Sequence, residues 1–514
     1  MHAASLAGAA ILLLAAALLP VDGVVEGLAA RFNTVRAFRG DFARGLQLLR
    51  LALAANGLLL ALLPLALRRA KLVPGRSIRP ERPDLLTAGG LWALTALLAL
   101  PGLFESFQDD EWRVLEQYIR HGPLVILSRS SADNHLLQSL LSWPFVALLG
   151  ISEVAVRLPV YLLTPFAPVL LFALLRREHP RGPAFAGALP LAVSPFLLQY
   201  ASEGRGYGPL LASVLGLILL REPLAAGSRR AWIASSLLGA AAVLFHLFAA
   251  PVVAALAIPF RKEDRAPERA WRLGSALAIS AALAFLVSAP TLPQVVGYGA
   301  GRPDGVVPSD RGPLFALAET FSFPFPALLA LALVPAFACS PRSLVPALVA
   351  AGLQAALIAV THAGHAPRFY VASVALAWVA VGAGAAAGFA SRKPLGRIAL
   401  LAPILLGLAA DVAYLRLGRR DYRGAARELQ SRRAPGETLA TAFDGRPLTP
   451  YLPGGLEVRT FDGLLARPPD WFVVVDVNLR LDRRLDPWLE ERYERIFGLP
   501  STRGEVTGYR LRRR

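Results

Sequence analysis

Long apolar runs alternating with short polar segments dominate the pattern of this 514-residue chain. Runs such as 46–67 and 371–390 carry almost no charge over about 17–25 positions, the length that crosses the apolar core of a bilayer. Only a helix closes all of its backbone hydrogen bonds within one such segment, so each run predicts a membrane-spanning helix. The predicted spans, about thirteen in all, cover residues 4–20, 46–67, 85–103, 157–175, 184–200, 207–221, 231–247, 248–260, 273–292, 313–338, 343–361, 369–390 and 396–415.

The polar segments between the spans divide into two sets that alternate along the chain. One set is short and densely basic, and the other is sparser in basic residues and holds most of the acidic ones. Because basic loops stay on the cytoplasmic side, the segment 104–156 and the C-terminal tail are predicted to face outward. The basic, cytoplasmic set comprises residues 68–83, 176–183, 221–230, 261–272 and 391–397.

The two ends of the chain differ from the bundle between them. The first apolar run has no basic region before it, so it predicts a retained anchor helix and not a cleaved signal peptide. From residue 421 onward the pattern is that of a soluble domain, and about 95 residues are enough for a small core. The predicted elements are helices at 421–433 and 487–497 and strands at 438–442, 471–477 and 509–512.

The predicted fold is therefore an all-α polytopic membrane protein with a small C-terminal α/β domain. Residues 1–83 form an extra N-terminal two-helix unit with a basic cytoplasmic loop. Residues 84–420 form the main transmembrane domain, whose outward first loop holds the candidate catalytic residues. Residues 421–514 form the outward soluble domain.

Composition narrows the class of protein further. The net charge is +18, but the basic residues are spread over loops between apolar spans and form no soluble basic face, which excludes a nucleic-acid-binding protein. Arginine greatly outnumbers lysine and the chain is rich in Ala, Leu, Gly and Pro, a composition typical of high-GC bacteria. We therefore expect a bacterial cytoplasmic membrane. The single cysteine, Cys339, excludes an intramolecular disulfide.

Three consecutive carboxylates, Asp109, Asp110 and Glu111, follow the third predicted span. Carboxylates at the edge of a bilayer need water or a cationic partner. One of them can act as a general base toward an acceptor hydroxyl. The alternative is a solvated loop start, which acidic residues often mark.

The same outward segment continues with Asp133-Asn134-His135 and an apolar stretch at 136–150. This stretch is short for a span and predicts a helix along the membrane surface. Asp133 and His135 are candidates for substrate binding, whereas a lone His is more often a structural polar residue. His246, where two predicted spans meet on the outer face, fits either role equally. No second His or Cys stands at ligand spacing, so no metal site is predicted.

Two further polar groups lie at outer ends of predicted spans. One, SPFLLQYASEGRGY, contains Glu203, Arg205 and Tyr207, and the other contains Arg368 and Tyr370. A guanidinium at headgroup depth can hold a phosphate through paired hydrogen bonds. The alternative is an interfacial anchor, because Arg and Tyr both favour that depth.

A glycine-rich stretch at 382–388 (GAGAAAG) superficially resembles a nucleotide-binding loop. It lies inside an apolar span with no strand before it, so that interpretation fails. Close helix packing through Gly384 and Gly388 is predicted instead.

Taken in order, these motifs resemble the membrane glycosyltransferases of the GT-C type, which use polyprenyl-phosphate sugars and include protein O-mannosyltransferases and aminoarabinose transferases. Leu136-Leu137 stands where the family has a Pro-Pro pair, and the two spans before residue 70 look like an addition to the family's core. The matching elements are Asp110-Glu111, Asp133-Asn134-His135, Gly150 to Pro159, Ser194 to Tyr207 and Arg368-Phe369-Tyr370.

The resemblance implies an inverting transfer of a sugar from a polyprenyl-phosphate carrier to a hydroxyl of a lipid, glycan or protein, among membrane lipids at the outer face. Asp110 is the expected general base, ahead of Asp109, while Glu111 and Asp133 would orient the acceptor or an arginine. Arg205 is the first candidate for the donor phosphate and Arg368 the second. No cofactor is implied with certainty, and a divalent cation stays open. The remaining candidates are Tyr207 and Tyr370 beside the phosphate, and His135, Glu203 and His246 beside the substrate.

Other functions stay open at this point. A polysaccharide polymerase or ligase would transfer a whole glycan from a lipid pyrophosphate. A transporter or flippase predicts inverted repeats and charges at mid-membrane, whereas here the charges cluster at the outer ends of spans and no repeat is evident. A structural membrane scaffold is the fourth interpretation.

Overall fold

A computed structural model describes most of the chain. The residues outside this description are 1, 33–35, 37–38, 74–80, 130–133, 259–261, 296–319, 321–332, 340–344, 361–366, 392–393, 442, 453–454, 460, 476–484, 502–503 and 513–514.

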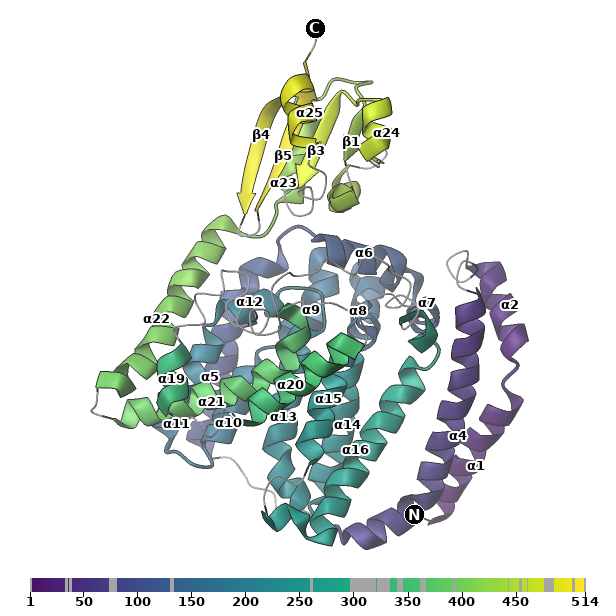
Figure 1. The fold of residues 1–514 in the computed structure, drawn as a ribbon, viewed down its shortest axis with the longest axis vertical. Helices are drawn as coiled ribbons and strands as arrows, with labels where there is room; N and C mark the ends of the chain where they lie inside the picture. The colour runs from purple at the N-terminus through teal and green to yellow at the C-terminus, as the bar shows by residue number, and fades with distance from the viewer. Residues whose placement is uncertain are drawn as a thin grey trace.

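The first four-fifths of the described chain is helical (Figure 1). Its α-helices are α1 (His2–Leu18), α2 (Val21–Arg31), α4 (Arg39–Ala70), α5 (Arg82–Ala99), α6 (Asp109–Gln117), α7 (Pro123–Ser128), α8 (Leu136–Leu149), α9 (Glu153–Leu163), α10 (Phe166–Leu175), α11 (Arg181–Ala192), α12 (Pro195–Ala201), α13 (Tyr207–Ala225), α14 (Arg229–Phe245), α15 (Ala250–Ala257), α16 (Pro267–Ser288), α19 (Val334–Cys339), α20 (Val345–Val360), α21 (Val371–Ala390) and α22 (Pro394–Leu417). Short 3₁₀ turns that matter below are η1 (Leu100–Leu103), η3 (Leu247–Ala249) and η7 (Pro367–Tyr370).

Seven helices among the described residues are long and apolar enough to cross a membrane, or up to nine if each bent pair counts as one span. The predicted multi-span helical architecture is confirmed, whereas the count of about thirteen is not. The pairs α1–α2 and α11–α12 are bent by 71° and 64°. Most of the predicted span at 313–338 lies outside the described residues.

The break between α11 and α12 follows from the local sequence. Ser194 caps α12, its hydroxyl accepting a hydrogen bond from the Leu197 N–H at 3.2 Å, and Pro195 occupies the first helical position. Both residues favour the start of a new helix over the continuation of the old one. The chain consequently turns here and brings residues 202–206 to one end of the bundle.

The centre of the bundle is formed by α10, α11, α13 and α21, which pack on one another (Figure 1). Small residues permit this close approach, as predicted for the glycine-rich stretch in α21. A Cβ on Gly384 would lie 2.0 Å from the Ala336 carbonyl oxygen, and one on Gly388 would lie 2.2 Å from that of Gly396. The prediction that these two glycines serve helix packing is confirmed.

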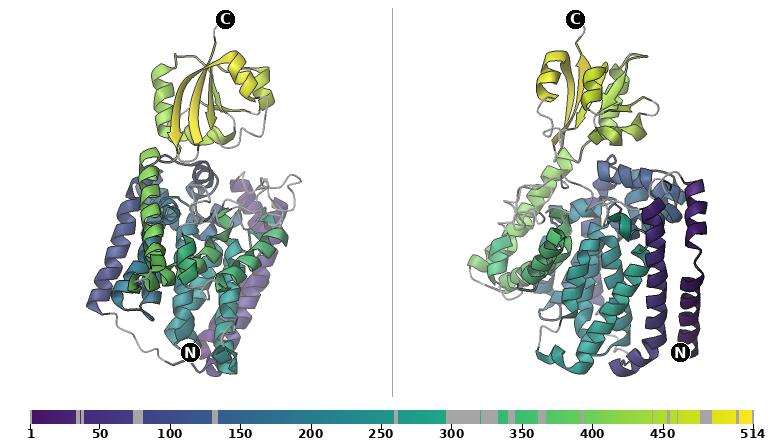
Figure 2. Two further views of the ribbon diagram at one scale, coloured as in Figure 1. Left: turned by 60° about the vertical axis from the view of Figure 1, so that its left-hand side comes forward. Right: turned by 45° about the vertical axis from the view of Figure 1, so that its right-hand side comes forward.

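The N-terminal helices form a unit at the edge of the bundle (Figure 2). α1 packs along α4, and α4 packs on α16. Asn56 of α4 links this helix to α16. Its side-chain N–H donates to the Ala282 carbonyl of α16 at 3.0 Å and to the Ala52 carbonyl of α4 at 2.8 Å. Only 17% of the apolar window of α4 is buried, which leaves most of this helix facing its surroundings.

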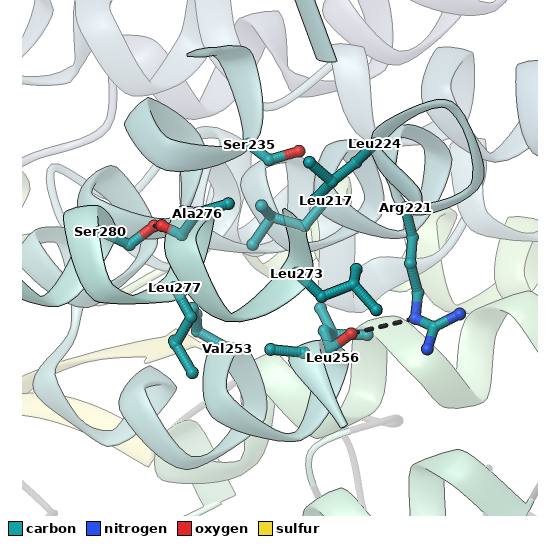
Figure 3. A pocket seen from close by; sticks show the side chains of 11 residues that line it. Leu217, Arg221, Leu224, Ser235, Val253, Leu256, Leu273, Ala276, Leu277 and Ser280 are labelled. Carbon is teal, nitrogen blue, oxygen red and sulfur yellow. Dashed lines mark hydrogen bonds between the residues drawn. The ribbon is translucent and has the colours of Figure 1, made fainter. Parts of the chain in front are cut away.

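Figure 3 shows side chains that line a small cavity between α13, α14, α15 and α16. The volume of this cavity is about 40 Å³. Its lining is mostly leucine and alanine, and Arg221 at its edge donates from Nε to the Leu256 carbonyl at 3.0 Å. A space of this size holds a few water molecules at most and is far smaller than ligand pockets of several hundred Å³. It is therefore a packing defect and not a candidate active site.

The C-terminal domain contains a five-stranded sheet in the order β2-β1-β3-β5-β4. β1 runs parallel to β2 and β3, while β5 runs antiparallel to β3 and β4. The predicted α/β fold of this domain is confirmed. Its elements are α23 (Tyr422–Arg432), β1 (Leu439–Thr441), η8 (Phe443–Tyr451), β2 (Glu457–Val458), α24 (Phe461–Ala466), β3 (Trp471–Val475), α25 (Leu485–Arg492), β4 (Tyr493–Ser501) and β5 (Gly504–Leu511).

One predicted element of this domain is wrong in part. The helix expected over 487–497 ends at Arg492, and Tyr493 begins a nine-residue strand. Tyr493, Ile496 and Phe497 are residue types that favour strands, and pairing with β5 supplies the hydrogen bonds that a helix would otherwise provide. The Asp476 end of the predicted strand at 471–477 lies outside the described residues.

Candidate active site

The helix α6 carries the three consecutive carboxylates and lies at the end of the bundle that faces the C-terminal domain (Figure 1). The span α5 closes with η1, and the chain then runs through residues 104–108 into α6. Acidic residues favour the first turn of a helix because they oppose the positive end of its dipole. Glu111, at the third position, also accepts a hydrogen bond from the Gln108 N–H at 3.0 Å, which caps the helix.

Consecutive residues of a helix point about 100° apart, so the three carboxylates meet different surroundings. Asp109 turns along its own helix and forms an ion pair with Arg113. Asp110 and Glu111 each contact an arginine from a distant part of the chain. Their roles therefore differ although their chemistry is the same.

Glu111 is completely buried and holds α6 against the bundle. Its carboxylate accepts from Arg157 Nε at 2.8 Å and Nη2 at 2.5 Å, and from the Gly204 N–H at 2.6 Å. Burial by itself would raise the pKa of Glu111, but the charge and hydrogen bonds of Arg157, then Arg419, lower the pKa to about 2. With both oxygens engaged and no exposed surface, Glu111 is placed as an anchor and not as a group that contacts substrate.

Asp110 faces two guanidinium groups from distant segments. Arg205, between α12 and α13, forms an ion pair with the Asp110 carboxylate, and Arg368 in η7 approaches the same oxygen to 3.5 Å. The exposed fractions of the three side chains are 24% for Asp110, 2% for Arg205 and 37% for Arg368. The accessible pair is thus Asp110 and Arg368, while Arg205 lies behind them.

Two histidines, His135 and His246, lie near Arg205 and Arg368. The Nδ1 of His135 lies 2.6 Å from the Phe245 carbonyl oxygen and therefore carries the proton, so its Nε2 accepts from Arg205 at 3.3 Å. Burial, and then the charge of Arg205, hold the pKa of His135 well below its usual range. The same causes lower the pKa of His246 to about 3, and its Nδ1 accepts from the Phe248 N–H at 3.3 Å. Both imidazoles are neutral, so they add no positive charge beside the arginines.

Aromatic rings complete this wall of the site. Tyr207 lies with its ring 4.7 Å from that of His135 and 5.4 Å from that of His246, and Arg205 stacks over it at 5.1 Å. Phe369 contacts His246 with a ring separation of 5.6 Å. The Tyr207 hydroxyl is buried and has no hydrogen-bond partner among the described residues. Such a group can be satisfied by a bound water or substrate.

The two remaining candidate site residues in the described chain are Glu203 and Tyr370. Glu203 is nearly buried, accepts from Gln199 Nε2 at 3.2 Å and lies 3.9 Å from Arg205. Tyr370 is 1% exposed and packs with Ile358, and Phe248 and Phe369 pack against these two residues. The role of Tyr370 beside the donor phosphate stays a prediction.

Asp133 and a possible metal site are the remaining predictions about the site. Asp133 lies outside the described residues, so its part in the site stays a prediction. Within the described part of the chain, no group of three or more His, Cys, Asp and Glu side chains could hold a metal ion.

Arg157 and Arg419 both contact Glu111 and were not among the candidate site residues, although Arg157 lies in the matching element Gly150 to Pro159. Both side chains are fully buried, and Arg419 donates to the carbonyl oxygens of Gly102 at 3.0 Å and Ser202 at 2.5 Å. Their signal in the sequence is an arginine at the edge of an apolar span, where a charge is costly without a partner. That signal does not say which carboxylate is the partner.

Apolar spanning helices with a carboxylate–guanidinium cluster at one end define a multi-pass membrane protein with a polar site at the end of its bundle. Residues 134–293 match the family model of dolichyl-phosphate-mannose-protein mannosyltransferases. The predicted resemblance to GT-C membrane glycosyltransferases is thereby confirmed over this range. A solved structure, that of ArnT from Cupriavidus metallidurans in the apo state, is similar at a TM-score of 0.48 and 14% identity, covering 82% of this chain and 98% of that chain. No curated protein matches the chain.

Proposed function

We propose that the protein is an inverting glycosyltransferase that moves a sugar from a polyprenyl-phosphate carrier to a hydroxyl acceptor at the outer face of the bacterial cytoplasmic membrane. The observation that carries this proposal is the contact of Asp110 with Arg205 and Arg368, three residues separated by 95 and 258 positions in sequence. The cluster combines a base with positive charge for a phosphate, and both are needed for this reaction.

In the proposed reaction the acceptor oxygen attacks the anomeric carbon from the face opposite the phosphate. The new carbon–oxygen bond forms as the bond to the phosphate oxygen breaks, and the phosphate leaves with that electron pair. Asp110 accepts the hydroxyl proton. The polyprenyl phosphate is a stable anion, so a general acid is not required.

Of the two arginines, Arg368 is the better placed to hold the phosphate. From the sequence, Arg205 ranks first and Arg368 second, so the order is reversed here. It is the more exposed guanidinium, and its 3.5 Å contact to Asp110 is the looser of the two. An arriving phosphate competes with Asp110 for Arg368. This exchange would stabilise the leaving group and at the same moment release the carboxylate from one of its two guanidinium partners, which favours its taking a proton.

The neighbouring residues then have supporting roles. Arg205 keeps Asp110 in place from behind, and His135 keeps Arg205 in place. Glu111 anchors α6, and Asp109 is occupied with Arg113. Asp133 stays a candidate for acceptor binding.

The test is a transfer assay with purified protein in lipid or detergent. Radiolabelled polyprenyl-phosphate monosaccharides and, in parallel, lipid-pyrophosphate glycans are offered together with lipid, glycan and protein acceptors. The proposal expects label to move from the monophosphate donor to a product with inverted anomeric configuration. Transfer from the pyrophosphate donor alone would support a polymerase or ligase, and movement of lipid across vesicles without covalent transfer would support a transporter.

A further inference from the structure

The chain between the last span and the C-terminal domain is bound to the three residues that precede α6, which we call the entry segment (residues 106–108). The Ser106 hydroxyl donates to the Arg420 carbonyl at 2.8 Å and accepts from the Tyr422 N–H at 3.0 Å. The Gln108 side chain donates to the same Arg420 carbonyl at 3.2 Å. Two of the three residues are therefore held by the stretch that leads into the C-terminal domain.

The middle residue of the entry segment is held by the domain itself. The Phe107 N–H donates to the Tyr451 hydroxyl at 2.9 Å, and that hydroxyl donates in turn to the Glu153 carboxylate. Arg423 of α23 donates to the same carboxylate at 2.5 Å and lies over the Tyr451 ring at 5.6 Å. Burial, and then Glu153, raise the pKa of Tyr451, so its hydroxyl keeps the proton that it donates.

These contacts join three separate parts of the molecule at one hydroxyl. Tyr451 comes from η8 of the C-terminal domain, Phe107 from the entry segment and Glu153 from the first turn of α9. Asp110 follows Phe107 by three residues in the first turn of α6. A rotation of that turn would move the carboxylate relative to Arg205 and Arg368.

We propose that the C-terminal domain positions the catalytic carboxylate, with Tyr451 as the positioning residue that fixes the entry segment and hence the direction of Asp110. This inference rests on the proposed transfer reaction for its effect on rate. Its structural part, the ordering of α6 by Tyr451, is independent of that reaction. A displacement of about 1 Å at a reacting group can cost about a hundredfold in rate, so one lost hydroxyl is enough to matter.

The test uses Tyr451→Phe in the full-length protein, which keeps the ring and removes only the hydroxyl. The matched control is Tyr493→Phe, which removes another buried hydroxyl of the same domain, one that donates to the Pro469 carbonyl at 2.8 Å far from α6. We expect kcat to fall by about tenfold or more in Tyr451→Phe, with the donor KM unchanged, and neither to change in the control. Hydrogen–deuterium exchange in residues 105–117 should become faster in Tyr451→Phe alone.

The outcomes separate this inference from the proposed function. Wild-type kcat and wild-type exchange in Tyr451→Phe would overturn the inference while the transfer activity stands. Faster exchange at α6 in a protein that transfers no sugar would retain the positioning and overturn the proposed function.

A second variant guards against a folding defect. Arg423→Gln removes the ion pair with Glu153 at a side chain that is 41% exposed, where a change is tolerated. We expect the same direction of change in kcat and in exchange, at a smaller size. Equal effects in the Tyr493→Phe control would assign the losses to general destabilisation of the domain and overturn the inference.

Discussion

At the scale of single residues, Asp109, Asp110 and Glu111 share one functional group but not one environment. Asp109 pairs within its own helix, Asp110 meets two guanidiniums at an accessible site, and Glu111 is enclosed. The rotation of about 100° per helical residue is sufficient to separate them. Only Asp110 combines a partly exposed carboxylate with a position suited to both proton and phosphate.

Replacement of Asp110 tests its assignment as the base. Asp110→Asn keeps the shape of the side chain and removes its basicity, so we expect turnover to fall by about 10²–10⁴-fold. The matched variant Asp109→Asn, one residue earlier, should lose severalfold at most. Initial rates of sugar transfer measure both, with thermal unfolding as the check on folding. Full activity in Asp110→Asn would end the assignment.

Arg368 is the residue through which donor phosphate recognition can be tested. Arg368→Gln removes the charge at the exposed side of the site, and we expect the donor KM to rise by about tenfold or more, since hydrogen bonds to charged groups contribute about 1.5–3 kcal/mol. Arg432→Gln is the control, because it removes a comparably exposed arginine paired with Glu428 in the C-terminal domain. The donor dependence of the transfer rate distinguishes them. An unchanged donor KM in Arg368→Gln would remove this residue from the phosphate site.

At the scale of elements, the ion pair between Glu111 and Arg157 fastens α6 to α9. Both side chains are 0% exposed. Removing one partner of such a pair leaves an uncompensated buried charge and typically costs about 3–5 kcal/mol. The pair therefore fixes the orientation of α6, on which the position of Asp110 depends.

Because of this ion pair, we expect the stability of the folded protein to depend on pH. The pKa of Glu111 is about 2 in the folded protein against an ordinary value of 4.5, so the unfolded chain binds the proton more readily. The stabilisation, on the order of 3 kcal/mol, is complete above about pH 4.5 and declines as the pH falls toward 2. Thermal unfolding of the solubilised protein between pH 6 and about pH 3 should show this decline. In Glu111→Gln, the unfolding temperature should start lower and fall less steeply over this range.

At the scale of the whole molecule, the C-terminal domain stands at the end of the bundle where α6 lies (Figure 1). The distribution of basic loops predicts that this end faces outward. Single cysteines in a Cys339→Ala background test this orientation. We expect an impermeant maleimide to label Ser431→Cys in intact spheroplasts, and Arg230→Cys, in the first turn of α14, only after the membrane is opened. The reverse labelling pattern would place the site in the cytoplasm.

Much of the architecture was predictable because it depends on local physics. An apolar run of sufficient length must become a helix in lipid, and the start of β3 at Trp471 follows from a run of aromatic and β-branched residues. The two departures have different causes, the first tertiary and the second local. Tyr493 enters a strand because β5 is there to pair with it, and the bent pair α11–α12 is interrupted where Ser194 and Pro195 start a second helix.

The sequence alone determined the multi-span class, the α/β character of the tail and the residue types available at the ends of the spans. Tertiary structure alone decided which carboxylate faces which arginine. Asp110 and Glu111 are adjacent and chemically alike; helical rotation turns them in different directions, but it does not say which arginine each one meets. Their partners lie 95 and 46 positions away, on the segment between α12 and α13 and on α9, and the positions of these segments beside α6 decide the pairing. The contact of Tyr451 with Phe107 spans 344 positions and depends on how the C-terminal domain docks on the bundle. No periodicity of the sequence predicts that docking.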